Sequence, residues 1–402
     1  MIERNLYIEQ LKPFIDKPQI KILTGIRRCG KSTVMNLLRQ ELLKLGKNES
    51  QIIAANFESF VFSEINSAKK LYNFIRKKFT KKQKYYLLLD EIQEVNEWEK
   101  AINSLLSNFD VDIYLTGSNS HLLSSELATY LTGRYVEFQI FTLSYKEFID
   151  FRTHYLPEKS KHFAEYLRLG GFPVIHTADY QEETAYKVVC DIYSSVILRD
   201  TVQRYNIRDV ELLERVVKYA FDNIGNTFSG KNVADFFKSQ HRKIDMNTVY
   251  NYLHALEGAF ILFRAPRYNI KGKEILKTQE KFYLGDISLL YATMGYRDRL
   301  IGGILENIVF LELKRRGYQV FVGKFDTKEI DFIAEKRNEK IYIQVAYKLD
   351  SEQTVEREFS VLQAINDNFP KYVVTMDEFW KESIGGIKHL HISDFLQMKS
   401  LF

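Results

Sequence analysis

The segment that decides the fold is GIRRCGKS, Gly25–Ser32, which lies between an apolar run, Ile20–Thr24, and a helix-like run, Thr33–Leu45. Its pattern, G-x-x-x-x-G-K-[ST], predicts a loop in which the glycines let backbone N–H groups turn towards phosphate oxygens. A helix that begins at such a loop adds its positive N-terminal end. We expect Lys31 to reach the β- and γ-phosphates of ATP and Ser32 to hold Mg²⁺. The loop residues expected to contact the nucleotide also include Gly25, Arg27, Arg28, Cys29, Gly30 and Thr33.

Two further strand-like runs end in polar residues that suit nucleotide hydrolysis. The first, YYLLLDE (Tyr85–Glu91), ends in two acids. We expect Asp90 to bind Mg²⁺ through water and Glu91 to polarise the attacking water. The second, Val111–Thr116, leads into Ser118 and Asn119. One of these two side chains is expected to sense the γ-phosphate or position the water, and the sequence leaves the choice between them open.

Composition narrows the class of protein. The chain has 402 residues, is 45% hydrophobic and carries a net charge of +5, which predicts two to four well-packed domains. Its two cysteines, Cys29 and Cys190, are too few for a disulfide framework. The N-terminus has no apolar signal-peptide core, and apolar runs such as Ala259–Phe263 are too short to cross a membrane. We therefore expect a cytoplasmic protein without a membrane partner.

One strongly basic run has two interpretations. Lysine and arginine make up eight of the sixteen residues in Lys69–Lys84, and none of the others is acidic. Such a cluster favours a nucleic-acid partner. However, Leu71, Phe74, Ile75 and Phe79 recur at helical spacing, so the run also suits the solvated face of a helix that covers a sheet.

The chain divides into four sections. Residues 1–145 alternate strand-like and helical segments, which predicts an α/β fold with an open parallel sheet. The five strands are expected at Ile20–Thr24, Gln51–Phe57, Tyr85–Leu89, Val111–Thr116 and Val136–Ile140. Residues 146–195 look helical, residues 196–295 are helical and then strand-like, and residues 296–402 are mixed α/β.

The first section resembles an AAA+ ATPase, because the loop, the DE pair and the polar-ended strand are followed by LTGRY, Leu131–Tyr135. The resemblance implies ATP and Mg²⁺ as cofactors and makes Arg134 a finger supplied to a neighbouring subunit, in an oligomer such as a hexamer. A surface arginine after a turn is the alternative. The Arg27-Arg28 pair resembles one prokaryotic AAA+ group that also shows GGFP, Gly170–Pro173, and a stretch like Tyr193–Ile207. The resemblance makes residues 146–195 a helical lid.

The third section has the order of a winged helix-turn-helix. Helical patterns at Val210–Ile224, Gly230–Lys238 and Asn247–Leu256 precede two strand-like segments around a basic loop. If Val249, Leu253 and Leu256 face inwards, the opposite side of the third helix is free to meet a DNA groove. The candidate DNA contacts are Asn247, Tyr250, Asn251, His254 and, from the basic cluster Arg264–Lys281, Arg267, Lys271 and Lys273. A winged helix that packs between subunits is the alternative.

The last section looks like a PD-(D/E)xK nuclease fold with an altered site. The family's helical glutamate and strand aspartate match Glu306 and Asp331, but Gln344 and Ala346 stand where the family has glutamate and lysine. Gln344 keeps an oxygen ligand without the charge, and Ala346 removes the lysine. Lys348, two residues on, is one candidate substitute for that lysine. We expect a degenerate nuclease-like domain that does not cleave.

These observations favour Mg²⁺-dependent ATP hydrolysis by an oligomeric AAA+ ATPase that acts on duplex or branched DNA. A nucleotide-controlled protein-interaction switch, for regulation or defence, is the second hypothesis. An ATP-gated nuclease is the third, and the changes at Gln344 and Ala346 count against it.

Overall fold

The computed structural model describes residues 2–119, 133–159, 161–239, 245–295, 297–378 and 383–401. The chain forms two compact units, Met1–Ile140 and Phe141–Phe402. Among the described residues, no helix combines the length and the apolar character needed to cross a membrane.

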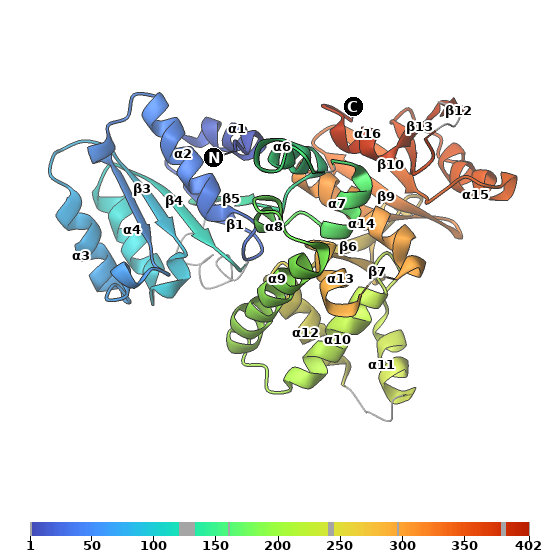
Figure 1. Ribbon diagram of the computed structural model, residues 1–402, viewed down its shortest axis with the longest axis horizontal. Helices are drawn as coiled ribbons and strands as arrows, with labels where there is room; N and C mark the ends of the chain where they lie inside the picture. Colours follow the sequence, from blue (N-terminus) through green and yellow to red (C-terminus); the bar gives the residue numbers. More distant parts are fainter. Residues whose placement is uncertain are drawn as a thin grey trace. The chain divides into compact units, whose positions relative to one another are not determined.

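The first unit contains a five-stranded, fully parallel sheet in the order β2-β3-β4-β1-β5 (Figure 1). Each predicted strand is confirmed to within one residue at either end. The strands are β1 (Ile20–Thr24), β2 (Ile52–Asn56), β3 (Tyr85–Asp90), β4 (Val111–Gly117) and β5 (Tyr135–Gln139). The helices are α1 (Asn5–Leu11), α2 (Lys31–Lys44), α3 (Ala68–Lys78) and α4 (Trp98–Asn108). The sheet is therefore the predicted α/β fold of a P-loop ATPase.

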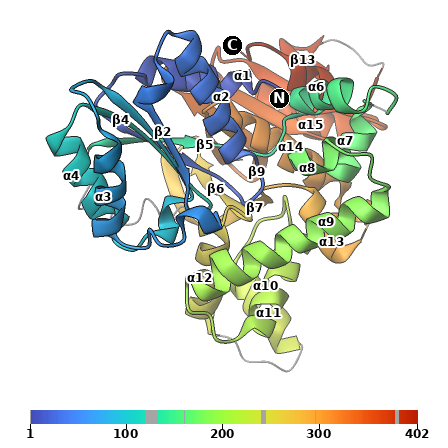
Figure 2. The ribbon, with the colours of Figure 1, turned by 60° about the vertical axis from the view of Figure 1, so that its left-hand side comes forward.

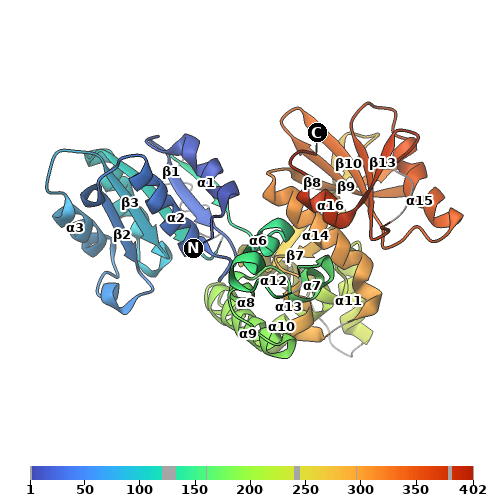
Figure 3. The same ribbon diagram turned by 45° about the horizontal axis from the view of Figure 1, so that its top comes forward.

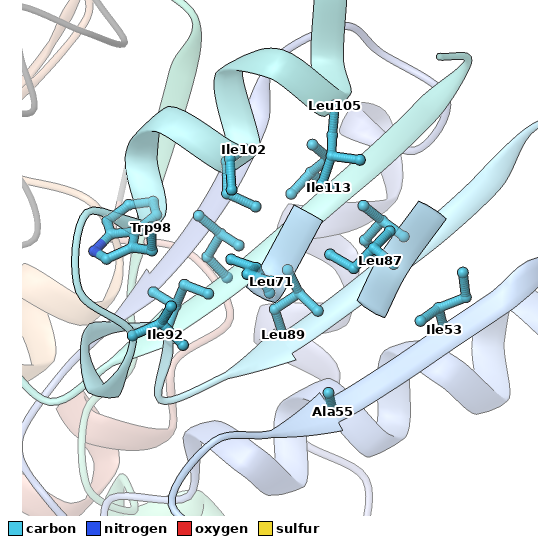
Figure 4. Packing of buried hydrophobic residues seen from close by; sticks show 14 of the residues in the cluster. Ile53, Ala55, Leu71, Leu87, Leu89, Ile92, Trp98, Ile102, Leu105 and Ile113 are labelled. Atoms are coloured by element: carbon cyan, nitrogen blue, oxygen red, sulfur yellow. The ribbon is translucent and has the colours of Figure 1, made fainter. Parts of the chain in front are cut away.

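Helices α3 and α4 bury one apolar face each against this sheet. Leu71 from α3 and Ile102 and Leu105 from α4 meet Leu87 and Leu89 of β3 (Figure 4). These contacts use the helical spacing seen in the sequence, and the lysines and arginines of α3 are left on its solvated side. The helical interpretation of the basic run is confirmed, although such a face remains available to an anionic partner.

The second unit begins with a series of helices (Figure 2). They are α6 (Tyr145–Tyr155), α7 (Phe163–Leu169), α8 (Pro173–His176), α9 (Glu182–Ser195), α10 (Val210–Asp222), α11 (Gly230–Ser239), α12 (Met246–Gly258) and α13 (Ser288–Met294). A π-helix over Val196–Gln203 continues α9. The GGFP segment is fixed to the start of α13, because Asp286 accepts hydrogen bonds from the Gly171 N–H at 2.8 Å and the Ser288 hydroxyl at 2.5 Å.

An eight-stranded sheet completes the second unit, in the order β12-β13-β11-β10-β9-β8-β6-β7 (Figure 3). The strands are β6 (Leu262–Asn269), β7 (Glu274–Leu284), β8 (Gln319–Phe325), β9 (Lys328–Lys336), β10 (Glu339–Val345), β11 (Lys371–Thr375), β12 (Ser383–Ile384) and β13 (Ile387–His391). The remaining helices are α14 (Ile301–Arg315), α15 (Glu352–Gln363) and α16 (Ile392–Gln397). The hairpin β6–β7, expected as the wing, is part of this sheet because β6 pairs in parallel with β8. The boundary expected near residue 295 therefore divides segments that share one sheet.

Candidate active site

Two glycines shape the loop between β1 and α2. Gly25 has a φ of +144°, and a Cβ there would lie 2.1 Å from the Ile140 carbonyl oxygen, so no larger residue fits. Gly30 adopts a left-handed conformation, with φ +103°, directly before α2 begins at Lys31. The loop backbone therefore lies at the N-terminal end of α2. The N–H groups there have no helical partners and favour an anion.

Lys31 is only 4% exposed, and its ammonium points into this loop. Its Nζ donates to the Gly25 carbonyl oxygen at 3.0 Å and lies 3.8 Å from Oε1 of Glu91. Glu91 supplies the one carboxylate within 4 Å of this ammonium in the described part of the chain. Because 3.8 Å is beyond hydrogen-bonding distance, the buried cation lacks a close anion, which fits a phosphate ligand.

Asp90 and Ser32 bring together an oxygen set suited to Mg²⁺. Ser32 and Thr116 both hydrogen-bond the Asp90 carboxylate, and the Glu91 N–H donates to Thr116 Oγ1 at 2.9 Å. Burial raises the pKa of Asp90, while the two hydroxyl contacts act to lower it. A hydroxyl and a carboxylate side by side match the oxygen ligands that Mg²⁺ prefers. Thr116 was missed in the sequence, although its place at the end of the neighbouring strand was a usable signal.

Glu91 leaves β3 through a sharp change of backbone direction. Its φ of 52° is left-handed, which is costly for a residue with a side chain and is often found at functional sites. Gln93 Nε2 donates to Glu91 Oε2 at 2.5 Å, so the carboxylate is held from one side. Ser118 and Asn119 follow β4 and are fully buried. That one of them senses the γ-phosphate or positions the water stays a prediction, and which of the two does so stays open.

The other loop residues have different environments. The Arg27 guanidinium pairs with Glu58, Arg28 is exposed, and Thr33 is half-buried. Cys29 is fully buried, and burial raises the pKa of its thiol. Its carbonyl oxygen accepts a hydrogen bond at 2.8 Å from the buried Arg4, a contact that the sequence did not signal because Arg4 belongs to no motif.

Arg134 lies at the opposite end of the strands from the loop. The Ile20 N–H donates to the Arg134 carbonyl at 2.7 Å, and Tyr135 pairs with Ile20 at the start of β1. Since the loop follows the far end of β1, about 15 Å of strand separates Arg134 from it. The guanidinium donates to Asn103 Oδ1 at 2.9 Å. Arg134 cannot reach the loop of its own chain; Leu131 and Thr132 of the same motif lie outside the described residues.

The candidate DNA contacts in the second unit fall into two groups. Asn247, Tyr250, Asn251 and His254 all lie on the exposed side of α12, while Val249, Leu253 and Leu256 are buried. In the β6–β7 hairpin, by contrast, Arg267 lies 3.6 Å from Glu329 and Lys271 2.6 Å from Asp326. Lys273 is exposed. Two of the three hairpin candidates therefore have their charges offset by carboxylates.

Glu306, Asp331 and Gln344 do come together, from α14, β9 and β10, at a cavity of about 390 Å³. Lys348 does not substitute for the missing lysine: it lies beyond the end of β10, is exposed and contacts the Tyr347 ring. The ammonium that contacts Glu306 and Asp331 is that of Lys281 of β7, from the cluster that the sequence suggested for phosphate contact. It is 2% exposed and unavailable to DNA.

This region does not fit the Mg²⁺ that the nuclease resemblance implies. Glu306, Glu329 and Asp331, here called the carboxylate cluster, all contact the Lys281 ammonium. Burial and the neighbouring Glu306 raise the pKa of Asp331 to about 8. Within the described ranges, no group of three or more acidic, histidine or cysteine side chains has the geometry to hold a metal ion.

The parallel sheet and its loop define a P-loop ATPase of the AAA type, and the comparisons with known proteins agree. Residues 17–149 match an AAA domain, and residues 160–300 match a domain of unknown function (DUF8612). An uncharacterized protein of Haemophilus influenzae is 38% identical over 98% of both chains. The uncharacterized protein MJ1544 of Methanocaldococcus jannaschii is 30% identical, covering 92% of this chain and 86% of its own. The chain belongs to the family of these two relatives.

Among solved structures, the Walker-type ATPase PABY2304 of Pyrococcus abyssi is similar with a TM-score of 0.49 and 14% sequence identity. The match covers 73% of this chain and 96% of that chain.

Proposed function

We propose that this AAA-type protein hydrolyses ATP with Mg²⁺ in an oligomer and uses the turnover to act on DNA. The observation that carries the hydrolysis is the buried Lys31 ammonium, which lies between loop carbonyls and Glu91. Lys31 binds the β- and γ-phosphates, Ser32 and Asp90 hold the metal, and Glu91 orients and polarises a water. The bound Mg²⁺ offsets the charge that develops on the transferred phosphoryl group.

The oligomer is proposed from the position of Arg134. Arg134 lies at the end of the strands opposite to the loop of its own chain, so it can serve as a finger only for another copy. The guanidinium donates to the neutral amide of Asn103, and that contact leaves its positive charge uncompensated. Such a charge stabilises the transition state when it meets the γ-phosphate of a neighbouring subunit.

The DNA partner is proposed from two exposed surfaces, one in each unit. Helix α12 exposes four polar or aromatic side chains along one side, which is the composition used to read a groove. Helix α3 ends with Arg76, Lys77 and Lys78 and exposes all three, which suits contacts to phosphates.

The test is the ATPase rate with duplex, branched and single-stranded DNA at two salt concentrations. Stimulation that falls steeply with salt supports the DNA role, because phosphate contacts release counterions. Asn247→Ala with Asn251→Ala should reduce this stimulation and leave the DNA-free rate unchanged. Lys187→Ala, on the exposed side of α9, is the matched control. An ATPase rate that none of the three kinds of DNA changes would contradict the proposal.

The second candidate is a nucleotide-controlled switch that binds protein partners through the second unit. It is favoured by the β6–β7 hairpin, whose Arg267 and Lys271 are already paired with acids and so contribute little to phosphate binding. An ATPase rate indifferent to DNA, together with normal turnover, supports this alternative.

A further inference from the structure

The carboxylate cluster of the second unit is assembled from two separate elements. Glu306 comes from α14, and Glu329 and Asp331 come from β9. The three carboxylates face one another beside the 390 Å³ cavity that Gln344 also lines. Such a convergence of acids, of which Asp331 is buried and Glu306 and Glu329 are partly buried, is unfavourable unless a cation compensates it.

Lys281 provides that cation from a third element, β7. Its Nζ lies 2.8 Å from Glu329 Oε1, 3.0 Å from Glu306 Oε2 and 3.5 Å from Asp331 Oδ1. One ammonium therefore contacts every member of the cluster at hydrogen-bonding distance or close to it. Since Lys281 is 2% exposed, water does not replace any of these contacts.

Other groups of the protein also form hydrogen bonds with the oxygens that a metal ion would need as ligands. The Tyr283 hydroxyl donates to Glu306 Oε2 at 2.9 Å, and the Val345 N–H donates to Asp331 Oδ2 at 2.8 Å. Gln344 Oε1 accepts from the Asp331 N–H at 3.2 Å. A divalent cation needs about six oxygens at roughly 2.0–2.6 Å. To enter, it would have to displace the ammonium and break these hydrogen bonds.

We propose that Lys281 is the built-in cation of the carboxylate cluster and takes the position where a divalent metal ion would otherwise bind. The lysine fastens the β6–β7 hairpin to α14 and β9, and it excludes metal from the site. It follows that the ammonium is the principal obstacle to metal binding, because it contacts all three carboxylates. Removing it while keeping the carboxylates creates a divalent-cation site. This inference does not depend on the proposed ATPase function.

The experiment titrates Mn²⁺ into the full chain without nucleotide and follows free Mn²⁺ by electron paramagnetic resonance. Lys281→Met keeps the length and apolar stem of the lysine but removes its charge. The variant should bind one more Mn²⁺ per chain than the wild type, with a dissociation constant at least about tenfold lower than any site of the wild type. The double variant Lys281→Met, Asp331→Asn should lose the additional ion.

Lys328→Met is the matched control. Lys328 also lines the cavity, but its ammonium contacts the Ser360 hydroxyl rather than the cluster, so Mn²⁺ binding should stay as in the wild type. A folded Lys281→Met protein that gains no Mn²⁺ overturns the proposal. If Lys281→Met folds only with Mn²⁺ present, the metal has replaced the ammonium and the proposal is supported.

If Lys281→Met does not fold in any condition, the wild-type titration decides. Mn²⁺ binding that Glu306→Gln abolishes would show that the native cluster accepts metal, and the proposal is then wrong. A wild-type protein whose Mn²⁺ binding is unchanged by Glu306→Gln supports it. Lys281→Arg, which keeps a cation, should behave like the wild type in the same titration.

Discussion

Lys31 and Glu91 lie 3.8 Å apart although they follow strands, β1 and β3, that are separated in the sheet by β4. Thr116, at the end of the intervening β4, hydrogen-bonds the residues on both sides of the β3 end, Asp90 and Glu91. Strand β4 pairs with both β1 and β3, so it fixes the position of Lys31 relative to Glu91. In the proposed reaction, one binds phosphate and the other prepares water.

Glu91→Gln should bind ATP but turn it over roughly 10²–10⁴ times more slowly, because the amide keeps the shape of the side chain and cannot accept a proton. Steady-state phosphate release and a fluorescent-nucleotide titration measure the two quantities separately. Glu94→Gln, in the turn that follows, is the control and should leave the rate unchanged. Normal turnover by Glu91→Gln would disprove the assigned role.

Lys31→Ala should weaken ATP binding by roughly 10–100-fold, since a charge-assisted contact to phosphate contributes about 1.5–3 kcal/mol. Equilibrium titration with a fluorescent ATP analogue gives the affinity. Lys44→Ala is the matched control, because Lys44 lies at the exposed far end of α2. Equal affinity in wild type and Lys31→Ala would contradict the predicted phosphate contact.

Arg134→Ala should reduce the ATPase rate by roughly 10³–10⁵ while ATP affinity stays the same. Mixing Arg134→Ala with Glu91→Gln should restore part of the activity, because mixed oligomers contain sites with an intact glutamate next to an intact arginine. The rate of the mixture is compared with the sum of the two separate rates. No gain on mixing argues against a site shared between subunits.

Gly170→Ala should destabilise the second unit by roughly 3–5 kcal/mol. Gly170 has φ +66°, and an added Cβ would lie 2.1 Å from Oδ1 of the buried Asp286. Gly295→Ala is the matched control, because Gly295 has φ +72° but nothing within 4 Å of the added Cβ. Denaturant unfolding gives the free energy of unfolding of both variants, and the difference between them isolates the effect of the steric clash. Equal losses of unfolding free energy would mean that the clash with Asp286 contributes nothing beyond backbone strain.

His176 should make stability fall in acid. Burial lowers its pKa from 6.5 to about 4, and its Nε2 lies 2.9 Å from the Gly170 carbonyl oxygen. The unfolded chain therefore takes up the proton first, so stability is complete above pH 6.5 and falls as the pH drops towards 4. The loss is on the order of 3 kcal/mol.

The measurement for His176 is the thermal midpoint between pH 7 and pH 4.5 in wild type and His176→Gln, with His154→Gln, at an exposed position, as the control. The His176→Gln midpoint should depend less on pH than that of the wild type. Parallel pH profiles would show that His176 is not the group responsible.

The first unit could be predicted in detail because each of its strands and the candidate site residues that follow it lie close together in the sequence. Ile20–Ser32 and Tyr85–Glu91 each contain a strand and the candidate site residues that follow it, and all five strands were found to within one residue. Thr116 and Arg4 were missed because their partners are distant in sequence: Arg4 hydrogen-bonds a carbonyl 25 residues away. A backbone carbonyl has no signature in a sequence.

In the second unit, individual elements were predicted but their associations were not. The helices now labelled α10, α11 and α12 were expected at nearly the observed residues. The role of Lys281 was hidden because its three carboxylates lie 25 to 50 residues further along the chain. Among other basic residues, it looked like a member of a cluster suited to phosphate contact. The pairing of β6 with β8 joins the hairpin that carries Lys281 to the eight-stranded sheet.

That pairing has a consequence for the order in which the protein folds. Strand β6 pairs on one side with β7 and on the other with β8, which begins at Gln319, some fifty residues later. During synthesis at about 5–20 residues per second, the hairpin leaves the ribosome seconds before its partner strand. In that interval β6 has an unpaired edge that can recruit another nascent chain. Slow translation between residues 285 and 319 should therefore increase aggregation of this protein, while its ATPase unit is already complete.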